Sequence, residues 1–367
     1  MDLVAGAEKL LSLRVASDWR EWEALVSRSP YADTYYRPGY VAAYWSEGAN
    51  IRGLVLNTKS RRFLLPLVFR PLSKLSFAPG ASGFDVITPY GYGGILPLEQ
   101  GPVSQEDGAQ LVASVQGWCK LESVVSCFIR LHSLEAQHLW FEGLRLDGVD
   151  LQYSGPTKSV ELLEWDEAQV VPTGLPKGRR DKMRWARRKL ALEMYTCDEP
   201  ASDAALQQFI EIYKGTMDRR QASGFYYFPD SYYRDLARGL GRDMAIVIAR
   251  AQEQPVAAAI FFADGKYAHF HLSGSTDEGR RLHSSAVVIL KGAEWARARG
   301  CTRLHLGGGV TPNDSLFMFK DTFGGQTFEF YSLRIVADQA RYADLLQRRL
   351  EAGGDPLRPN FFPEYRA

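Results

Sequence analysis

The order of secondary-structure patterns in the first half of the chain returns in the second half, and this repetition constrains the fold more than any single motif. Apolar spacing predicts a helix over residues 18–27, and alternating runs predict an antiparallel hairpin between residues 51 and 69. Later in the chain, the patterns predict a helix over residues 203–218 and a hairpin between residues 244 and 263, in the same order. We therefore interpret the chain as an internal duplication of one lobe.

Each predicted hairpin is followed by a further helix and strand, and this order sets the fold class. In the first half, the patterns predict a helix over 107–121 and a strand over 124–131. In the second half, they predict a strand over 267–273, a helix over 281–299 and a strand over 303–306. Such an order is typical of an α+β (mixed α/β) layered architecture. The first half closes with a predicted helix over 133–140 and strands over 149–153 and 158–163.

The length and a break in periodicity predict the domain organisation. A chain of 367 residues is long enough for two domains. Pro172, Gly174 and Pro176 interrupt the periodicity near the middle of the chain and mark a boundary there. We expect a first lobe at residues 1–165, a second lobe at 166–335, and a C-terminal helix and tail at 336–367 that pack back on the first lobe.

Composition excludes several classes of protein. The net charge is +1 and 46% of the residues are hydrophobic, which fits a folded globular chain and excludes an acidic disordered one. The four cysteines lack the C-x-x-C spacing of zinc or redox sites, so we expect reduced structural thiols. The first residues lack the pattern of a signal peptide, and no run of eighteen apolar residues occurs. A cytoplasmic protein is therefore expected.

The histidines and the common catalytic motifs give no metal or nucleophile site. His269 and His271 stand two residues apart on one predicted strand, a spacing that can hold a metal, but the sequence offers no evident third ligand. His305 lies just before a run of glycines, and we expect it on the wall of a site. The H-E-x-x-H, G-x-S-x-G and phosphate-loop motifs do not occur, which argues against a zinc protease, a serine hydrolase and an NTPase. No metal is expected.

A basic helix is the first feature that indicates a partner. Residues 177–189 read KGRRDKMRWARRK and carry eight basic side chains against Asp181. Helical spacing places Met183, Ala186 and Leu190 on one face and most of the cations on another. Like charges at this spacing destabilise a helix that lacks a counter-charge, so a phosphate-bearing partner is favoured over a solvated helix. The candidate binding residues of this face are Arg180, Arg184, Arg187 and Arg188.

A glycine-rich strand end followed by an isolated lysine is the second feature. A strand that ends in glycines lets a ligand or another backbone approach closely. The next helix is predicted to begin near Asp314, a good N-cap residue, and it carries several aromatic side chains and one cation, Lys320, preceded by Phe319. A lysine in such a setting can stabilise an oxyanion, and a lysine that snorkels to solvent from a helix end is the alternative. The glycines are Gly307, Gly308 and Gly309.

Aromatic residues form the third group of candidates. Residues 87–94, ITPYGYGG, are predicted to form a stiff, exposed loop because half of them are Gly or Pro, and Tyr90 and Tyr92 are candidate substrate-binding residues. The aromatic segment 225–228 is interpreted as packing between the lobes, with a substrate groove as the alternative. Trp185 is interpreted as a core residue, with stacking on an exposed base as the alternative.

Together these motifs resemble the Fem family of aminoacyl-tRNA-dependent ligases. The resemblance extends over residues 30–335 with its motifs in the family's order, and the long coiled-coil arm of some members is absent. The motifs are the loop PYGYGG, the basic stretch at 180–188, the helix sequence IYKGTMDRR, the strand end LHLGGG and the pair Phe319-Lys320.

The resemblance implies two tandem GNAT-like lobes with a channel between them. It also implies a transferase that moves an amino acid from aminoacyl-tRNA onto an amine of a peptidoglycan precursor or a related acceptor, with no further cofactor. Lys320, beside Phe319, would then stabilise the tetrahedral oxyanion, and the four arginines would contact phosphates of the acceptor or of the tRNA. Aminolysis of an activated ester needs orientation and oxyanion stabilisation, so the missing catalytic triad agrees with this chemistry.

Two other functions stay open at this point. An acyl-CoA-dependent N-acyltransferase shares the lobe architecture, but its usual phosphate loop has glycines where residues 280–286 read RRLHSSA. Serine amides can also bind phosphate, so this difference does not remove the acyl-CoA alternative. A catalytically silent binding module is the third function, and an intact Lys320 site would argue against it.

Overall fold

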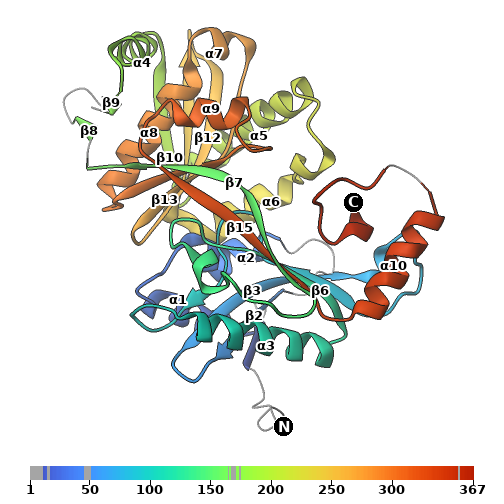
Figure 1. Ribbon diagram of the computed structural model, residues 1–367. Helices are drawn as coiled ribbons and strands as arrows, with labels where there is room; N and C mark the ends of the chain where they lie inside the picture. Colours follow the sequence, from blue (N-terminus) through green and yellow to red (C-terminus); the bar gives the residue numbers. More distant parts are fainter. Residues whose placement is uncertain are drawn as a thin grey trace. The chain divides into compact units, whose positions relative to one another are not determined.

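The chain folds into two compact units, and both mix helices with β-strands. The computed structural model describes residues 11–14, 17–44, 51–163, 165–166, 171–172, 175–353 and 356–367. Unit 1 consists of Met1–Ser154 together with Glu329–Ala367, and unit 2 consists of Gly155–Phe328. Figure 1 shows the elements of each unit. The predicted α+β class is therefore confirmed.

The sheet of unit 1 is mostly antiparallel with one parallel step. Its strands follow the spatial order β1, β2, β3, β4, β6 and β15, and β5 pairs with an end of β3. The predicted hairpin is confirmed as β2 and β3. Only β4 and β6 pair in parallel among these strands. The bounds are β1 (Leu11–Arg14), β2 (Ile51–Asn57), β3 (Arg62–Pro71), β4 (Phe84–Ile87), β5 (Leu96–Pro97), β6 (Val124–Arg130) and β15 (Gln326–Val336).

The sheet of unit 2 repeats this plan. Its strands follow the order β7, β14, β13, β12, β11 and β10. The predicted hairpin is confirmed as β11 and β12, and β13 and β14 form the parallel pair. The bounds are β7 (Val149–Glu161), β10 (Ala191–Thr196), β11 (Met244–Ala251), β12 (Gln254–Asp264), β13 (Tyr267–Ser275) and β14 (Arg303–Gly308). A separate pair, β8 (Trp165–Asp166) and β9 (Val171–Pro172), lies between the β7 and β10 segments of the chain.

A helix connects the two parallel strands in each unit, because parallel neighbours need a crossover connection. In unit 1 this helix is α3 (Gln105–Leu121), and in unit 2 it is α8 (Ser284–Ala298). The same order of antiparallel strands, crossover helix and parallel strand therefore occurs twice, as the duplication hypothesis requires.

The last strand of each sheet comes from the other half of the sequence. β7 follows the strands of unit 1 along the chain, but its later residues pair with β14 in unit 2. β15 follows the strands of unit 2, but its later residues pair with β6 in unit 1. The units consequently divide at Ser154 and Phe328, whereas the sequence analysis placed the divisions after residues 165 and 335.

Helices cover both faces of the unit 1 sheet. α3 packs on a core that includes Phe63, Phe69 and Cys127, while the C-terminal helix α10 packs with Tyr365 on a second core that includes Leu72 and Val125. The helices of unit 1 are α1 (Trp19–Arg28), α2 (Pro38–Ala42), α3 and α10 (Gln339–Glu351), with 3-10 turns at η1 (Thr34–Tyr36), η2 (Leu72–Lys74), η3 (Gln137–Trp140) and η6 (Glu364–Arg366).

Unit 2 has a core on each side of its sheet as well. One face carries α8 together with buried residues of α4 and the Phe323 ring that follows α9, and α5 packs against β12 and β13. The helices are α4 (Lys177–Lys189), α5 (Ser202–Arg219), α6 (Asp230–Leu240), α7 (Asp277–Arg281), α8 and α9 (Ser315–Asp321), with 3-10 turns at η4 (Gly224–Tyr226) and η5 (Gly241–Asp243).

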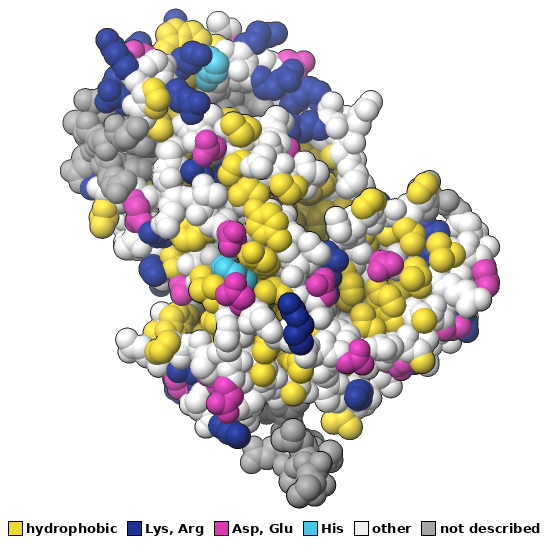
Figure 2. All heavy atoms as spheres, viewed as in Figure 1, with side chains coloured by type: hydrophobic (Ala, Val, Ile, Leu, Met, Phe, Trp, Pro, Cys, Tyr) yellow, Lys and Arg dark blue, Asp and Glu magenta, His cyan; other side chains and the backbone are white. Residues whose placement is uncertain are grey.

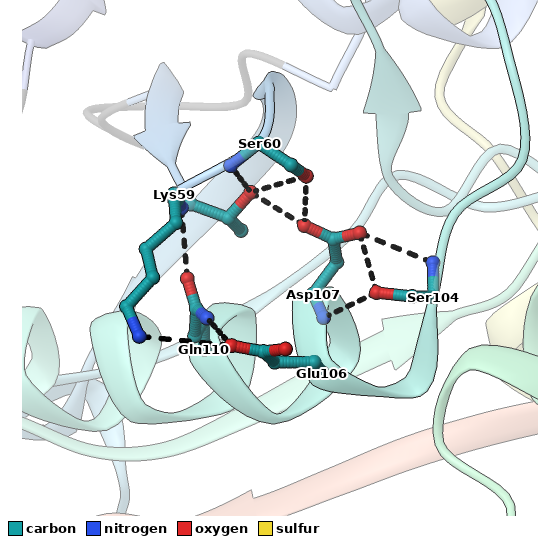
Figure 3. Close-up of polar contacts among 7 residues, drawn as sticks. Lys59, Ser60, Ser104, Glu106, Asp107 and Gln110 are labelled. Atoms are coloured by element: carbon teal, nitrogen blue, oxygen red, sulfur yellow. Dashed lines mark hydrogen bonds and ion pairs between the residues drawn. The ribbon is translucent and has the colours of Figure 1, made fainter.

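A hydrogen-bonded cap fixes the start of α3. Ser104 and Asp107 form a capping box, and the Asp107 carboxylate also accepts hydrogen bonds from Ser60 Oγ at 2.5 Å and Thr58 Oγ1 at 2.7 Å (Figure 3). Burial works to raise the pKa of Asp107, but hydrogen bonds from Ser60, Thr58 and Ser104 outweigh it and hold that pKa well below its usual value. The network therefore ties the β2–β3 turn to the crossover helix.

Several predicted elements differ from the structure for local reasons. The predicted helix over 133–140 is wrong: only the 3-10 turn η3 forms, after Ala136 in the left-handed conformation. The predicted helix over 281–299 forms as α8, which begins only at Ser284 because His283 before it has a φ of 54°, and the short helix α7 precedes it. The two strands predicted over 149–163 are one strand, β7. The sequence analysis missed β4, β10, α6 and β15.

Two further findings concern membrane-spanning helices and the state of the cysteines. Among the described residues, no helix is long and apolar enough to cross a bilayer. All four cysteines are free thiols, and burial raises the pKa of Cys119 to about 12.

Candidate active site

The candidate site in unit 2 begins where β14 ends. β14 and β13 pair over three residues only, from Arg303 to His305 on β14, while β13 continues to Ser275 beside β12. The register between β14 and β7 shifts between His305 and Gly307. This irregular strand end leads into the glycine turn, Gly307–Gly309. The turn follows His305, the last residue of β14 that pairs with β13.

Asp314 closes the glycine turn and caps α9. Its carboxylate accepts hydrogen bonds from the Phe317 amide at 2.8 Å and the Val310 amide at 2.7 Å. A Cβ atom at Gly309 would lie 2.3 Å from Asp314 Oδ1, so this position needs glycine. Burial works to raise the pKa of Asp314, but the backbone hydrogen bonds outweigh it and lower the pKa. The predicted N-cap near residue 314 is confirmed.

Lys320 is buried at the end of α9 and points toward the glycine turn. Its side chain is 7% exposed, and Nζ donates a hydrogen bond to the Gly308 carbonyl oxygen at 2.6 Å. A snorkelling lysine, the alternative in the sequence analysis, is therefore excluded. Burial lowers the pKa of Lys320 to about 7, while the nearby Asp314 carboxylate opposes that shift. Phe319 packs edge-on against Phe323, with ring centroids 5.5 Å apart.

A second buried lysine supports the same helix, and the sequence analysis missed it. Lys158 lies on β7 opposite Gly307 and is 6% exposed. Its Nζ lies 2.8 Å from Asp321 Oδ1 and donates a hydrogen bond to Thr327 Oγ1 at 3.1 Å. Residue spacing gave no signal for Lys158, because one lysine in a strand pattern is common and its partners are far away in sequence.

His269, His271 and His305 lie on the other face of the unit 2 sheet from Lys320. Leu304 and Leu306 belong to the core that Phe319 packs against, so strand alternation directs His305 to the opposite face. There His305 is buried, with its ring 5.6 Å from that of His269. His271 is hydrogen-bonded to the Tyr232 hydroxyl at 2.8 Å, and burial, with a smaller effect of His269, lowers the pKa of His271 to about 3. The sequence analysis expected His305 on the wall of the site. The structure does not bring His305 together with Lys320.

No metal centre replaces this arrangement in the part of the chain that the structure describes. There, no group of three or more histidine, cysteine, aspartate or glutamate side chains is placed to hold a metal ion.

The basic helix α4 lies on the same face of unit 2 as α9. Met183, Ala186 and Leu190 enter the core that Phe323 shares, which confirms the predicted apolar face. Dark blue side chains gather over α4 in Figure 2. Trp185 is 38% exposed and lies 6.4 Å from the His283 ring, so its interpretation as a core residue is wrong.

The four candidate arginines have different surroundings. Arg187 Nη1 lies 2.5 Å from Glu294 on α8, and Arg184 Nη1 lies 3.2 Å from Asp181. Arg188 is exposed, and Arg180 Nε is buried without a hydrogen-bond partner among the described residues. Arg187 therefore joins α4 to α8, while Arg188 is open to a ligand.

The loop that contains Tyr90 and Tyr92 is more buried than predicted. Tyr35 and Tyr40 of unit 1 pack against this loop: the Tyr40 hydroxyl donates to the Tyr90 carbonyl, and the Tyr35 ring lies 6.4 Å from that of Tyr92. A Cβ atom at Gly91 would lie 2.4 Å from the Tyr35 ring, so the glycine allows this packing. The predicted exposed loop is wrong. Tyr90 and Tyr92 belong to unit 1, and their meeting with Lys320 in one channel stays a prediction.

The aromatic segment after α5 is partly open to solvent. Phe225 and Tyr227 are exposed, whereas Phe228 stacks on Tyr232 with ring centroids 4.3 Å apart. Its packing between the lobes stays a prediction.

Comparison with known proteins defines the class of this fold. Residues 177–314 match the family described as Acetyltransferase (GNAT) domain. No sequence among the curated proteins matches the chain. The fold is that of the GNAT acyltransferases, with two such units in tandem, and the family match and fold together support an acyltransferase function.

Particular solved structures share this fold over nearly their whole length. FemX is 14% identical with a TM-score of 0.66, covering 88% of this chain and 97% of that one. The C-terminal domain of a putative lysylphosphatidylglycerol synthetase from Agrobacterium fabrum is 15% identical with a TM-score of 0.54, covering 92% and 96%. L-PGS from Bacillus licheniformis is 13% identical with a TM-score of 0.53, covering 90% and 96%. The predicted likeness to Fem ligases is confirmed as a likeness of fold.

Proposed function

We propose that the protein forms an amide bond by transferring an aminoacyl group from charged tRNA to an amine of a peptidoglycan-precursor-like acceptor, with Lys320 as the oxyanion stabiliser. The observation that supports this most strongly is the buried Lys320 Nζ, hydrogen-bonded at 2.6 Å to the Gly308 carbonyl. An ammonium group has three N–H donors, and Gly308 accepts one of them. The remaining donors can bind the developing oxyanion.

The reaction needs few protein groups. The acceptor amine attacks the carbonyl carbon of the aminoacyl ester, and a tetrahedral intermediate with a negative oxygen forms. Lys320 stabilises this oxygen, and collapse of the intermediate breaks the ester bond and releases the ribose oxygen of the tRNA. Groups of the substrates relay the proton from the amine to that oxygen. A preorganised donor in a buried setting acts strongly here because it does not reorganise during the reaction.

The similar structures and the surface charge support an aminoacyl donor. One similar structure is the C-terminal domain of a putative lysylphosphatidylglycerol synthetase, a name that includes a lysyl group. On α4, the exposed Lys182 and Arg188 present cations that suit a phosphate backbone. Because Arg187 pairs with Glu294, reversing its charge is expected to disturb folding. Arg187 is therefore not used to test tRNA binding.

We expect Lys182→Gln with Arg188→Gln to raise the KM for charged tRNA and to flatten its salt dependence, because each lost phosphate contact reduces the slope of log affinity against log salt by about 0.9. Steady-state kinetics at low and high salt measure this, with Lys120→Gln on the exposed surface of α3 as the control. A double variant with the wild-type salt slope would contradict the assignment of α4 to the tRNA.

An acyl-CoA donor is the second candidate, and the start of α8 favours it. His283 precedes α8 without a side-chain cap, and the first turn carries no acidic residue, so the helix N-terminus is suited to a phosphate group. The same amides serve a CoA diphosphate even though the sequence RRLHSSA lacks the usual glycines.

Product analysis separates these functions. The protein is incubated with charged tRNA or with acetyl-CoA, each with candidate amine acceptors, and the products are identified by mass spectrometry. An aminoacylated amine that forms with wild type and not with Lys320→Met supports the proposal. Acetylated product alone supports the CoA-dependent alternative. No product from either donor, together with measurable binding of the donor, supports a silent binding module.

A further inference from the structure

A basic cavity lies in unit 1, whereas Lys320 and the basic helix α4 belong to unit 2. Its volume is about 570 Å³, and the η2 segment, the end of α10 and the C-terminal η6 segment line it. Four cationic side chains line this cavity: Arg70, Lys74, Arg349 and Arg366. No carboxylate side chain is among the residues that line it within the described part of the chain.

One buried carboxylate beneath the cavity orients two of these arginines. Asp85 is fully buried, and its two oxygens lie 2.5 Å from Arg70 Nε and 2.5 Å from Arg366 Nε. The Tyr365 hydroxyl also donates to Asp85 at 3.3 Å. Arg70 and Arg366 therefore share one buried carboxylate, which carries a single negative charge between two guanidinium groups.

The arginines keep donors that these contacts do not use. Arg70 Nη2 is buried and has no hydrogen-bond partner among the described residues. A guanidinium has five N–H donors, and a buried donor without a partner costs free energy. Burial lowers the pKa of Arg70; Asp85 opposes this shift and the neighbouring Arg366 adds to it. Lys74 is exposed at the cavity and has no ion pair among the described residues. Arg349 differs, because it donates to the Gly353 carbonyl oxygen and to an oxygen of the terminal carboxylate of Ala367, which also lines the cavity.

We propose that this cavity binds the phosphate group of a phosphorylated ligand. Several cations around one cavity match a multiply charged anion better than a single carboxylate, and guanidinium groups bind phosphate oxygens through paired N–H donors. Phe77 and Phe361 line the same cavity and offer apolar surface to the rest of the ligand. Figure 2 shows hydrophobic side chains gathered over the part of the face that α10 and the C-terminal segment occupy in Figure 1.

Hydrogen–deuterium exchange of the full chain tests the proposal, because it reports where a ligand binds. Inorganic pyrophosphate is expected to slow exchange of amides in residues 349–353 and 361–366. Lys74→Glu is expected to weaken this binding about tenfold, the effect of losing one charge-assisted hydrogen bond. Lys120→Glu on α3 changes the net charge equally and is expected to leave the protection unchanged.

Vesicles identify the source of the phosphate. Phosphatidylcholine vesicles with and without phosphatidylglycerol replace pyrophosphate in the same measurement. Protection that only the anionic vesicles give, and that Lys74→Glu removes, assigns the cavity to a lipid headgroup; protection by pyrophosphate assigns it to a soluble phosphate compound. The proposal is overturned if neither probe protects these amides, if pyrophosphate protects α4 alone, or if both lysine variants lose protection equally.

Discussion

The two crossover helices, α3 in unit 1 and α8 in unit 2, occupy the same place in the repeated fold but begin in different ways. α3 starts with the Ser104–Asp107 capping box and has Glu106 and Asp107 in its first turn. α8 follows His283 in the left-handed conformation, without a side-chain cap or an acidic residue in its first turn. The N-terminus of α3 is therefore satisfied by the protein, while that of α8 is suited to an anion.

The difference indicates that, of two similar lobes, one can contribute mainly to stability and the other mainly to catalysis. In unit 1, side-chain hydrogen bonds tie the β2–β3 turn to the start of α3. The Tyr35 ring packs against Gly91 in the loop at 89–94. In unit 2, the strand after the crossover helix ends at a glycine turn with a buried lysine beside it. We accordingly expect changes in α3 to affect unfolding and changes around α8 and α9 to affect turnover.

The largest expected effect is that of Lys320→Met on turnover. Removing one preorganised oxyanion donor costs on the order of 10²–10³ in turnover, about 3–4 kcal/mol. Burial lowers the pKa of Lys320 to about 7, so the unfolded chain binds that proton more tightly and the buried ammonium opposes folding at neutral pH. The free energy of unfolding is therefore expected to stay within about 1 kcal/mol of wild type or to rise.

Turnover under saturating substrate and a melting curve measure the two quantities. Lys120→Met on α3 is the matched control and is expected to change neither. A loss of turnover that parallels a loss of melting temperature would make Lys320 a structural residue.

The next effect is on stability in unit 1. Asp107→Ala removes the acceptor of three hydroxyl groups and is expected to lower the free energy of unfolding at pH 7 by about 2 kcal/mol. Because the folded-state pKa of Asp107 is depressed, its contribution is fully present above the unfolded pKa of about 3.9 and is lost progressively as pH falls from there through the lower folded-state pKa. The difference from wild type should thus shrink in acid.

Urea unfolding at pH 7 and pH 3 tests this expectation, with the exposed Glu106→Ala as the neighbouring control. Equal losses in the two variants would show that the capping network is not the cause.

A smaller effect is expected at the start of α8. Ser285→Asp places a negative charge in the first turn, where it stabilises the helix by about 0.3–1 kcal/mol and repels a phosphate-bearing donor. The KM for the donor is expected to rise up to about fivefold while the melting temperature stays the same or rises. Gln105→Asp in the acidic first turn of α3 is the control. If both variants leave KM unchanged, α8 does not bind the donor phosphate.

The smallest effect concerns pH. The ammonium form of Lys320 predominates below its pKa of about 7, so kcat/KM is expected to fall as pH rises through that value. Asp314 holds this pKa up, and Asp314→Asn keeps a good cap residue but removes the charge, so the descending limb is expected to move to lower pH. A pH profile of kcat/KM measures the shift. Asp107→Asn should leave the limb in place, and an equal shift in both variants would contradict a local charge effect.

The sequence alone determined the parts of the molecule that depend on local periodicity and capping chemistry. The β2–β3 and β11–β12 hairpins, α5 and the apolar face of α4 followed from residue spacing, because burial of one face imposes that spacing. The cap near Asp314 followed from residue type, because a carboxylate accepts from the free amides of the first turn. The pairing of Phe319 with Lys320 came from the resemblance to a family.

Only the tertiary structure decided which distant segments meet. The exchange of β7 and β15 between the sheets, the burial of the loop at 89–94 under Tyr35 and Tyr40, and the ion pair of Lys158 with Asp321 join residues far apart in sequence. Strand alternation likewise turned His305 away from Lys320 although both lie near the glycines. Periodicity reports which face of an element is buried but not what buries it, since that depends on long-range packing.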